Sequence, residues 1–145
     1  MEWEEILQRV RDETTVALIS TEELEKRLKG KTAPVLLDIR KAEEYAVSHL
    51  PGARLMLPDS NPAVVLADLD KDTELVVYCS VGIRSARMAR KLEEAGFRNV
   101  ENLEGSIFKW ANEGRPVYRE SKEVEVVHPF NKKWGRLLDE TRHQY

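Results

Sequence analysis

The chain has 145 residues, of which 41% are hydrophobic and 34% charged, and its formal net charge is −3 at pH 7. That length suits a single domain with one core, and the slightly acidic balance without a basic run argues against nucleic-acid binding. A single cysteine excludes an internal disulfide and a multi-cysteine metal centre and indicates a reducing compartment, and the absence of an apolar leader or a bilayer-length apolar run predicts a cytoplasmic protein.

Hydrophobic residues alternate between helical and strand periods, which predicts α/β architecture with a mainly parallel sheet. The first element is an amphipathic helix, because Trp3, Ile6, Leu7 and Val10 recur at helical spacing. The elements expected next are a strand at 16–19, a helix from a Ser20/Glu23 capping box to about residue 30, a strand at 35–39, a short helix at 42–48, a short strand at 53–56 and a helix from 61 to about 69.

The second half of the chain continues the same alternation. We expect a strand at 75–79, a helix at 86–95 that Gly96 stops, a strand at 99–102 and a helix at 105–112. Residues after Val117 form a charged extension. Its only anchors are Phe130, Trp134, Leu137 and Leu138, which either wrap their own domain or fill a groove on a neighbour.

Cys79 stands where a buried apolar strand meets the following helix. Backbone N–H groups of the tight loop and the positive end of the helix dipole both favour a thiolate there. Gly82 supplies the free φ and ψ that a tight loop needs, and Arg84 adds a fixed charge with a planar donor fork. Ser85 can cap the helix and donate toward the same centre. The sequence therefore predicts a nucleophilic Cys79.

Three separated motifs are similar to those of one family. They are Leu36-Leu37-Asp38-Ile39-Arg40 followed by Glu44-Tyr45-Ala46-Val47-Ser48-His49-Leu50-Pro51-Gly52-Ala53; Val76-Val77-Tyr78-Cys79-Ser80-Val81-Gly82-Ile83-Arg84-Ser85; and Asn102-Leu103-Glu104-Gly105-Ser106 with Trp110 and Gly114-Arg115-Pro116-Val117. In this order and spacing the chain resembles the rhodanese family of sulfurtransferases from about residue 20 to residue 117.

The resemblance implies a five-stranded parallel sheet with helices on both faces. It divides the chain into an N-terminal helix and first strand (1–19), a rhodanese-like core (20–118) and an extension (119–145) that packs on the core or on a partner. It also implies that Cys79 takes sulfur from a donor such as thiosulfate and passes it to cyanide or a thiol, including a protein thiol. Ser80 to Ser85 would hold the persulfide, with no cofactor, metal, nucleic acid or membrane involved.

Two other functions compete with this interpretation. Cysteine phosphatases place five residues between cysteine and arginine to enclose a phosphoryl group, whereas four separate Cys79 and Arg84, and no general-acid aspartate is evident. The second alternative is a sulfur carrier or regulatory binding module with little small-molecule turnover. Ser80 replaces the basic residue common after the family's cysteine, so we expect weak attraction for thiosulfate. Val81 and Ile83 give the pocket mouth an apolar rim that suits a bulkier donor or a protein thiol.

For the other candidate residues, a structural role is the stronger expectation. Asp38 and Arg40 lie at the carboxyl end of a strand, where α/β sheets place their sites, so they are possible site support, although a structural ion pair is the stronger expectation. His49 is expected to make a hydrogen bond at a helix end rather than act as a base. The remaining candidates are His128 and His143, without a metal pattern, Phe108 and Trp110, expected in the core, and Arg87, Arg90 and Lys91, expected on a solvated helix face.

Overall fold

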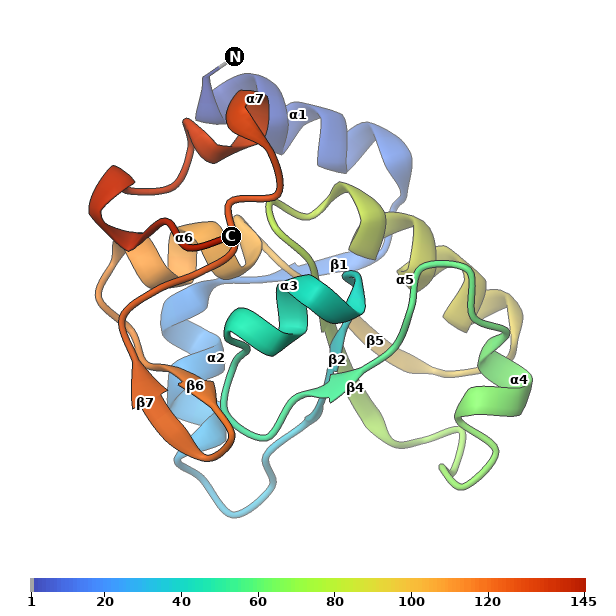
Figure 1. Ribbon diagram of the computed structural model, residues 1–145. Helices are drawn as coiled ribbons and strands as arrows, with labels where there is room; N and C mark the ends of the chain where they lie inside the picture. Colours follow the sequence, from blue (N-terminus) through green and yellow to red (C-terminus); the bar gives the residue numbers. More distant parts are fainter. Residues whose placement is uncertain (1) are drawn as a thin grey trace.

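The computed structural model describes residues 2–145 and contains a five-stranded sheet in the order β1-β5-β4-β2-β3 (Figure 1). Every neighbouring pair in it is parallel, as the sequence predicts. The strands are β1 (Ala17–Ile19), β2 (Val35–Asp38), β3 (Arg54–Leu55), β4 (Glu74–Tyr78) and β5 (Asn99–Leu103).

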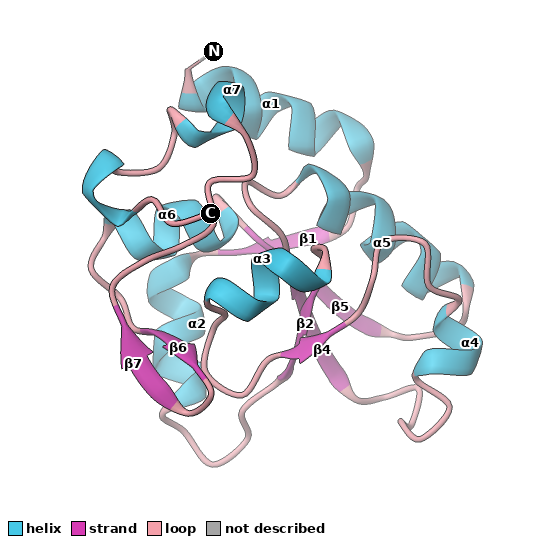
Figure 2. Ribbon diagram, in the orientation of Figure 1, coloured by secondary structure: helices cyan, strands magenta, loops and turns pink. Residues whose placement is uncertain are grey.

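Helices cover both faces of the sheet because its central strands are apolar on both sides (Figure 2). In β4, Val76 and Tyr78 belong to one buried cluster, and Leu75 and Val77 belong to the other. The helices are α1 (Trp3–Glu13), α2 (Thr21–Leu28), α3 (Ala42–Val47), α4 (Pro62–Val65), α5 (Ile83–Glu94), α6 (Ser106–Asn112) and α7 (Lys132–Gly135). This confirms the predicted α/β class.

Two helix boundaries differ from the sequence prediction by three residues or more. Helix α5 begins at Ile83 rather than 86, because Gly82 takes a left-handed φ of 115° and serves as the residue that precedes the helix. Ser85 therefore lies inside the first turn and is not the cap. Helix α4 ends at Val65 instead of near 69, because Leu66 leaves helical geometry with φ −108° and ψ 27° and the chain continues in turns. Of the predicted capping box, Ser20 Oγ accepts the Glu23 N–H at 3.1 Å.

The charged extension contains more structure than the sequence indicated. An antiparallel hairpin of β6 (Val117–Arg119) and β7 (Lys122–Val124) comes first, and α7 and a 3-10 turn (Glu140–Arg142) follow. Val127, Leu137 and Leu138 are buried, so the extension wraps its own domain. Helix α7 lies beside α1 (Figure 1), where the Arg9 guanidinium lies over the Trp134 ring, 5.7 Å from its centre.

Among the helices of residues 2–145, none combines the length and apolarity that crossing a bilayer requires.

Candidate active site at the Cys79 loop

Cys79 follows the central strand β4 directly, so the sheet delivers its side chain to the carboxyl edge. The first turn of α6 fixes the backbone orientation there. The Ile107 N–H donates to the Cys79 carbonyl at 3.2 Å, and the Phe108 N–H donates to the Ser80 carbonyl at 3.1 Å. The Cys79 N–H donates to Ser106 Oγ at 3.2 Å. Because these hydrogen bonds turn the carbonyls of Cys79 and Ser80 toward α6, the backbone N–H groups of the residues that follow can face the Cys79 sulfur.

The Cys79 sulfur accepts hydrogen bonds from the turn that follows it. The Gly82 N–H lies 3.1 Å from Sγ, and the Ser85 hydroxyl lies 3.5 Å from it. The single Ser85 hydroxyl proton is shared between the sulfur and Asn102 Oδ1, which lies 2.7 Å from Ser85 Oγ, and Asn102 Nδ2 donates to the Gly82 carbonyl at 3.1 Å. Asn102 therefore holds both donors in place, a role that the sequence analysis missed.

Opposing influences set the acidity of the Cys79 thiol. Burial raises its pKa, because a charged sulfur loses water there. The positive charge of Arg84 and the hydrogen bonds from Ser85 and Gly82 lower the pKa and outweigh burial. The net pKa of Cys79 lies below its ordinary value, which is the direction that a nucleophilic thiol needs.

Arg84 is held by a carboxylate that the sequence analysis did not single out. Its two Nη atoms donate to Glu44 of α3, at 2.9 Å to Oε2 and 3.0 Å to Oε1, and Nη2 also donates to Ser80 Oγ at 2.9 Å. Burial raises the pKa of Glu44, but the hydrogen bonds and charge of Arg84 leave that pKa below its usual value. The only early sign of Glu44 was its place inside the first motif, where acidic residues are also common in the first turn of a helix.

A pocket of about 190 Å³ leads to the sulfur. The Cys79 residue is only 1% exposed, so it lies at the base of this pocket rather than on the surface. The expected apolar residues Val81 and Ile83 line it. The other lining residues are Arg9, Ser80, Arg84, Arg87, Phe130 and Trp134.

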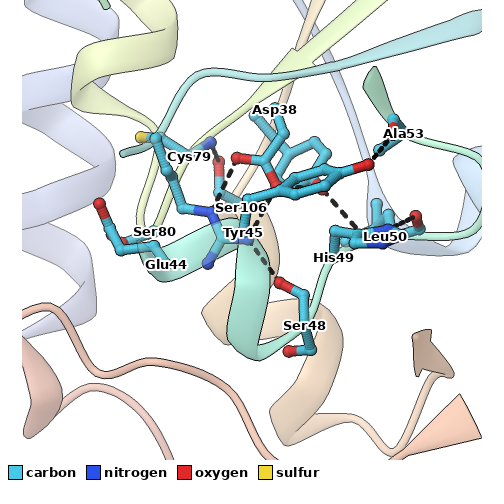
Figure 3. Close-up of polar contacts among 12 residues, drawn as sticks. Asp38, Glu44, Tyr45, Ser48, His49, Leu50, Ala53, Cys79, Ser80 and Ser106 are labelled. Atoms are coloured by element: carbon cyan, nitrogen blue, oxygen red, sulfur yellow. Dashed lines mark hydrogen bonds and ion pairs between the residues drawn. The ribbon is translucent and has the colours of Figure 1, made fainter. Parts of the chain in front are cut away.

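Asp38, labelled in Figure 3, forms a buried ion pair with Arg40. Arg40 donates through Nε and Nη2 to the two Asp38 oxygens at 2.8 and 2.7 Å, and Nη2 also donates to the Ser48 carbonyl at 2.7 Å. The Tyr78 hydroxyl donates to Asp38 at 2.6 Å and accepts the Leu50 N–H at 3.0 Å. Neither charged residue lines the pocket, so both tie β2 and β4 to the turn after α3.

His49, the two core aromatic residues and the basic residues of α5 occupy the structural positions that the sequence analysis expected for them. His49 Nδ1 is 2.9 Å from the Leu50 carbonyl oxygen, just after α3, and its ring stacks on Tyr45 (Figure 3). Phe108 and Trp110 are fully buried. Arg87, Arg90 and Lys91 are exposed, although Arg87 also lines the pocket. Within residues 2–145, no three His, Cys, Asp or Glu side chains gather closely enough to hold a metal ion.

The fold and the site together define a class of protein: a parallel α/β domain whose central strand presents one thiol to an amide, a hydroxyl and a nearby arginine.

Comparison with known proteins narrows this class. The model of the rhodanese-like domain matches residues 20–113. A sulfurtransferase of Allochromatium vinosum is 35% identical over 99 residues, which cover 68% of this chain and 92% of that protein. A rhodanese-like domain protein of known structure from Staphylococcus aureus is 30% identical, with a TM-score of 0.64 over 73% of this chain and 100% of that one. The match to the probable adenylyltransferase/sulfurtransferase MoeZ of Mycobacterium tuberculosis spans only 25% of that longer protein.

The chain belongs to the rhodanese-like domain family, and its relatives place it among the sulfurtransferases.

Proposed function

We propose that this protein is a sulfurtransferase that carries sulfane sulfur as a persulfide on Cys79. The Cys79 thiolate forms a bond to the outer sulfur of a donor such as thiosulfate, the donor's S–S bond breaks, and sulfite leaves with the electron pair. A thiophilic acceptor, cyanide or a thiolate, then bonds to the outer sulfur. The Cys79–sulfur bond breaks and the thiolate is regenerated.

One observation carries the proposal. The Cys79 sulfur lies at the base of a small pocket, 3.1 Å from the Gly82 N–H, with a pKa lowered below the ordinary thiol value. Preorganised donors of this kind stabilise negative charge on the entering nucleophile and on the persulfide that replaces it. No cofactor is needed, because the two steps exchange one sulfur atom between nucleophiles with balanced charge.

The arrangement favours sulfur chemistry over phosphoryl transfer. Both Nη atoms of Arg84 are bound to Glu44, so the guanidinium fork is not free to clamp a tetrahedral phosphate. We therefore expect the purified protein to leave an aryl phosphate intact. Sustained, Cys79-dependent hydrolysis of that ester would replace the sulfurtransferase proposal.

The decisive experiment follows sulfur by mass. After incubation with thiosulfate and removal of excess reagent, we expect one added sulfur atom on the peptide that contains Cys79. Cyanide should then remove this sulfur as thiocyanate. Cys79→Ser, which changes one atom, should keep the fold by circular dichroism and acquire no sulfur. If the wild-type protein gains none from any sulfane donor, the proposal fails.

The sulfur-carrier alternative predicts a different discharge. A carrier would load Cys79 but release sulfur only to one protein thiol, with little turnover of small acceptors. Because Cys79 is 1% exposed at the base of the pocket, a small acceptor reaches it more easily than a thiol fixed on a folded protein. We therefore expect many turnovers with cyanide or a low-molecular-weight thiol, and discharge limited to one protein partner would favour the carrier.

A further inference from the structure

Phe130 forms part of the Cys79 pocket in a backbone conformation that its side chain disfavours. The residue belongs to the extension, beyond the family-matched segment 20–113, and it lines the pocket together with Trp134. Its φ is 69°, in the left-handed region that a bulky residue seldom adopts, because its Cβ crowds the backbone. Such a conformation persists only where neighbouring contacts hold it, so the contacts of Phe130 decide how this wall of the pocket is kept in place.

Phe130 is held through both its ring and its backbone. The ring lies over the Arg84 guanidinium, 4.7 Å from the ring centre. The Phe130 N–H donates to His128 Nδ1 at 3.0 Å. Asn131 follows at once and begins α7, because its Oδ1 accepts the Trp134 N–H at 2.9 Å. One short segment therefore places both aromatic rings of the pocket.

The backbone contact requires a neutral His128. A backbone N–H can donate to Nδ1 only when that nitrogen keeps its lone pair, so the proton of the neutral ring lies on Nε2. Protonation of Nδ1 sets one N–H against another and breaks the hydrogen bond. The residue before His128 is fixed independently, since Val127 is fully buried and its N–H donates to the Arg142 carbonyl at 2.8 Å. Phe130 can therefore move while Val127 stays docked.

Acidic and basic groups face His128 from several elements. They are Glu43 and Glu44 of α3, Arg40 before α3, Arg84 of α5, and Tyr145, whose ring meets the imidazole edge-on. Burial lowers the pKa of His128 most, the two carboxylates raise it and the two guanidinium groups lower it, and the net pKa lies below the ordinary histidine value. Since an exposed His128 binds a proton more readily than the present one, protonation favours an arrangement in which this contact is open.

We propose that His128 is a pH-sensitive latch on the Cys79 pocket. Neutral His128 holds Phe130 over Arg84 and keeps the entrance narrow. When His128 is protonated, Phe130 relaxes to a negative φ, its ring leaves Arg84, and larger molecules reach the sulfur. The latch breaks hydrogen bonds alone, so it is reversible, and it concerns access to Cys79 whatever that thiol then does.

The test measures the rates at which maleimide and the bulkier N-phenylmaleimide alkylate Cys79 of the whole protein, from about pH 8 to about pH 5. The thiolate attacks the same double bond in both neutral reagents, so the ratio of the two rates cancels the ionisation of Cys79. Dividing by the same ratio for glutathione leaves the effect of the entrance. We expect the relative rate of N-phenylmaleimide to be low at neutral pH and to rise several-fold as His128 is protonated. Glu44 stays ionised in this range, because its pKa lies below its usual value.

Two variants of His128 separate the latch from a general loosening of the protein in acid. In His128→Asn the amide oxygen can accept the N–H two residues further on, as Asn does in turns, and it does not titrate. This variant should keep the low ratio at every pH. His128→Leu offers no acceptor and should give the high ratio at every pH. The control His49→Asn removes the titration of a histidine outside the pocket and should keep the wild-type rise.

Each outcome bears on the latch alone. A wild-type ratio that stays constant across this pH range would overturn it, as would a rise that persists in His128→Asn. A ratio for His128→Leu as low as that of the wild type at neutral pH would show that His128 does not hold Phe130. Should His128→Leu fail to fold by circular dichroism, the wild type and His128→Asn still decide. The measurement needs only the Cys79 thiol, so a failed latch leaves the proposed sulfur transfer standing, and a protein that loads no sulfur still tests the latch.

Discussion

At the scale of single residues, two charges control one thiol. Arg84 stabilises the Cys79 thiolate, and Glu44 fixes Arg84 while offsetting part of its charge. The carboxylate is 1% exposed and the guanidinium 21%, so solvent screens their interaction only in part. Glu44 is a positioning residue. Removing Glu44 and removing Arg84 should shift the pKa of the Cys79 thiol in opposite directions.

We expect Arg84→Gln to raise the apparent pKa of Cys79 and Glu44→Gln to lower it. The first change removes the favourable cation, whereas the second leaves that cation unbalanced. The measurement is the rate of Cys79 alkylation by a neutral reagent against pH, which rises as the thiol ionises. The wild-type midpoint should lie below that of an ordinary cysteine thiol. Arg90→Gln, on the same helix but outside the pocket, is the control. Equal midpoints in all four proteins would show that the pair does not tune the thiol.

The Arg84–Glu44 ion pair also makes the stability of the fold depend on pH. The pKa of Glu44 is lowered in the folded protein, so its stabilising contribution is complete above its unfolded value near 4.3 and is lost as the pH falls through the lower folded value. Glu44→Gln should cost about 1–3 kcal/mol at neutral pH, because it leaves Arg84 without its carboxylate. Below about pH 4 the difference from wild type should shrink. Urea unfolding of the wild type and of Glu44→Gln at several pH values measures the difference in their free energies of unfolding and its change with pH. A difference that stays the same at every pH would contradict this linkage.

At the scale of elements, the loop depends on a conformation that only glycine adopts easily. Gly82 has φ 115°, and a Cβ there would lie 3.3 Å from Val10 Cγ2 of α1. Gly82→Ala should therefore cost about 1–2 kcal/mol and slow sulfur loading, because the amide that faces Cys79 must shift. Gly114→Ala is the matched control: its φ is 79°, but nothing lies within 4 Å of the added carbon. It should lose stability without losing loading rate. Equal loading by both variants would contradict the role of the Gly82 amide.

The C-terminal hairpin shows why part of this architecture was not predictable. Its two-residue turn places Glu120 and Ser121 at positive φ, 48° and 69°. Two-residue turns with this geometry are normally signalled by Asn-Gly or Asp-Gly, so Glu-Ser gave no hairpin signal. The β4–loop–α5 unit was predictable because apolar period, glycine and cysteine all agree there. The places of Glu44, Phe130 and Trp134 at the site were not predictable, because their partners are distant in sequence and only the fold brings them together.

Restoring the usual turn residues should stabilise this element. The double change Glu120→Asn and Ser121→Gly suits the left-handed conformation that the present residues adopt with strain. We expect a gain of about 1 kcal/mol in urea unfolding with an unchanged rate of sulfur loading, because the hairpin lies outside the pocket. A loss of stability would mean that the native side chains make compensating contacts in the turn.

At the scale of the whole molecule, the two ends of the chain close over the central site. Helix α1 packs against α5, and the extension returns to α1 through α7 (Figure 1). The extension is held by buried anchors, by Ser48 Oγ donating to the Val126 carbonyl at 2.6 Å, and by Asn112 Nδ2 donating to the Leu137 carbonyl at 2.8 Å. Because Phe130 and Trp134 of the extension line the pocket, we expect access to Cys79 to depend on how firmly the extension docks.

That coupling can be measured with an anchor that does not touch the pocket. Leu138 is 3% exposed, and Leu138→Ala should cost about 2–4 kcal/mol by leaving a cavity beneath the extension. Weaker docking should let Phe130 and Trp134 move away from the pocket more often, so a neutral reagent should alkylate Cys79 several-fold faster at a pH where the thiol is fully ionised. Leu57→Ala, at a site 42% exposed, should change neither quantity. If Leu138→Ala loses stability but Cys79 reacts at the wild-type rate, Phe130 and Trp134 do not control entry to the pocket and the buried anchors of the extension serve stability alone.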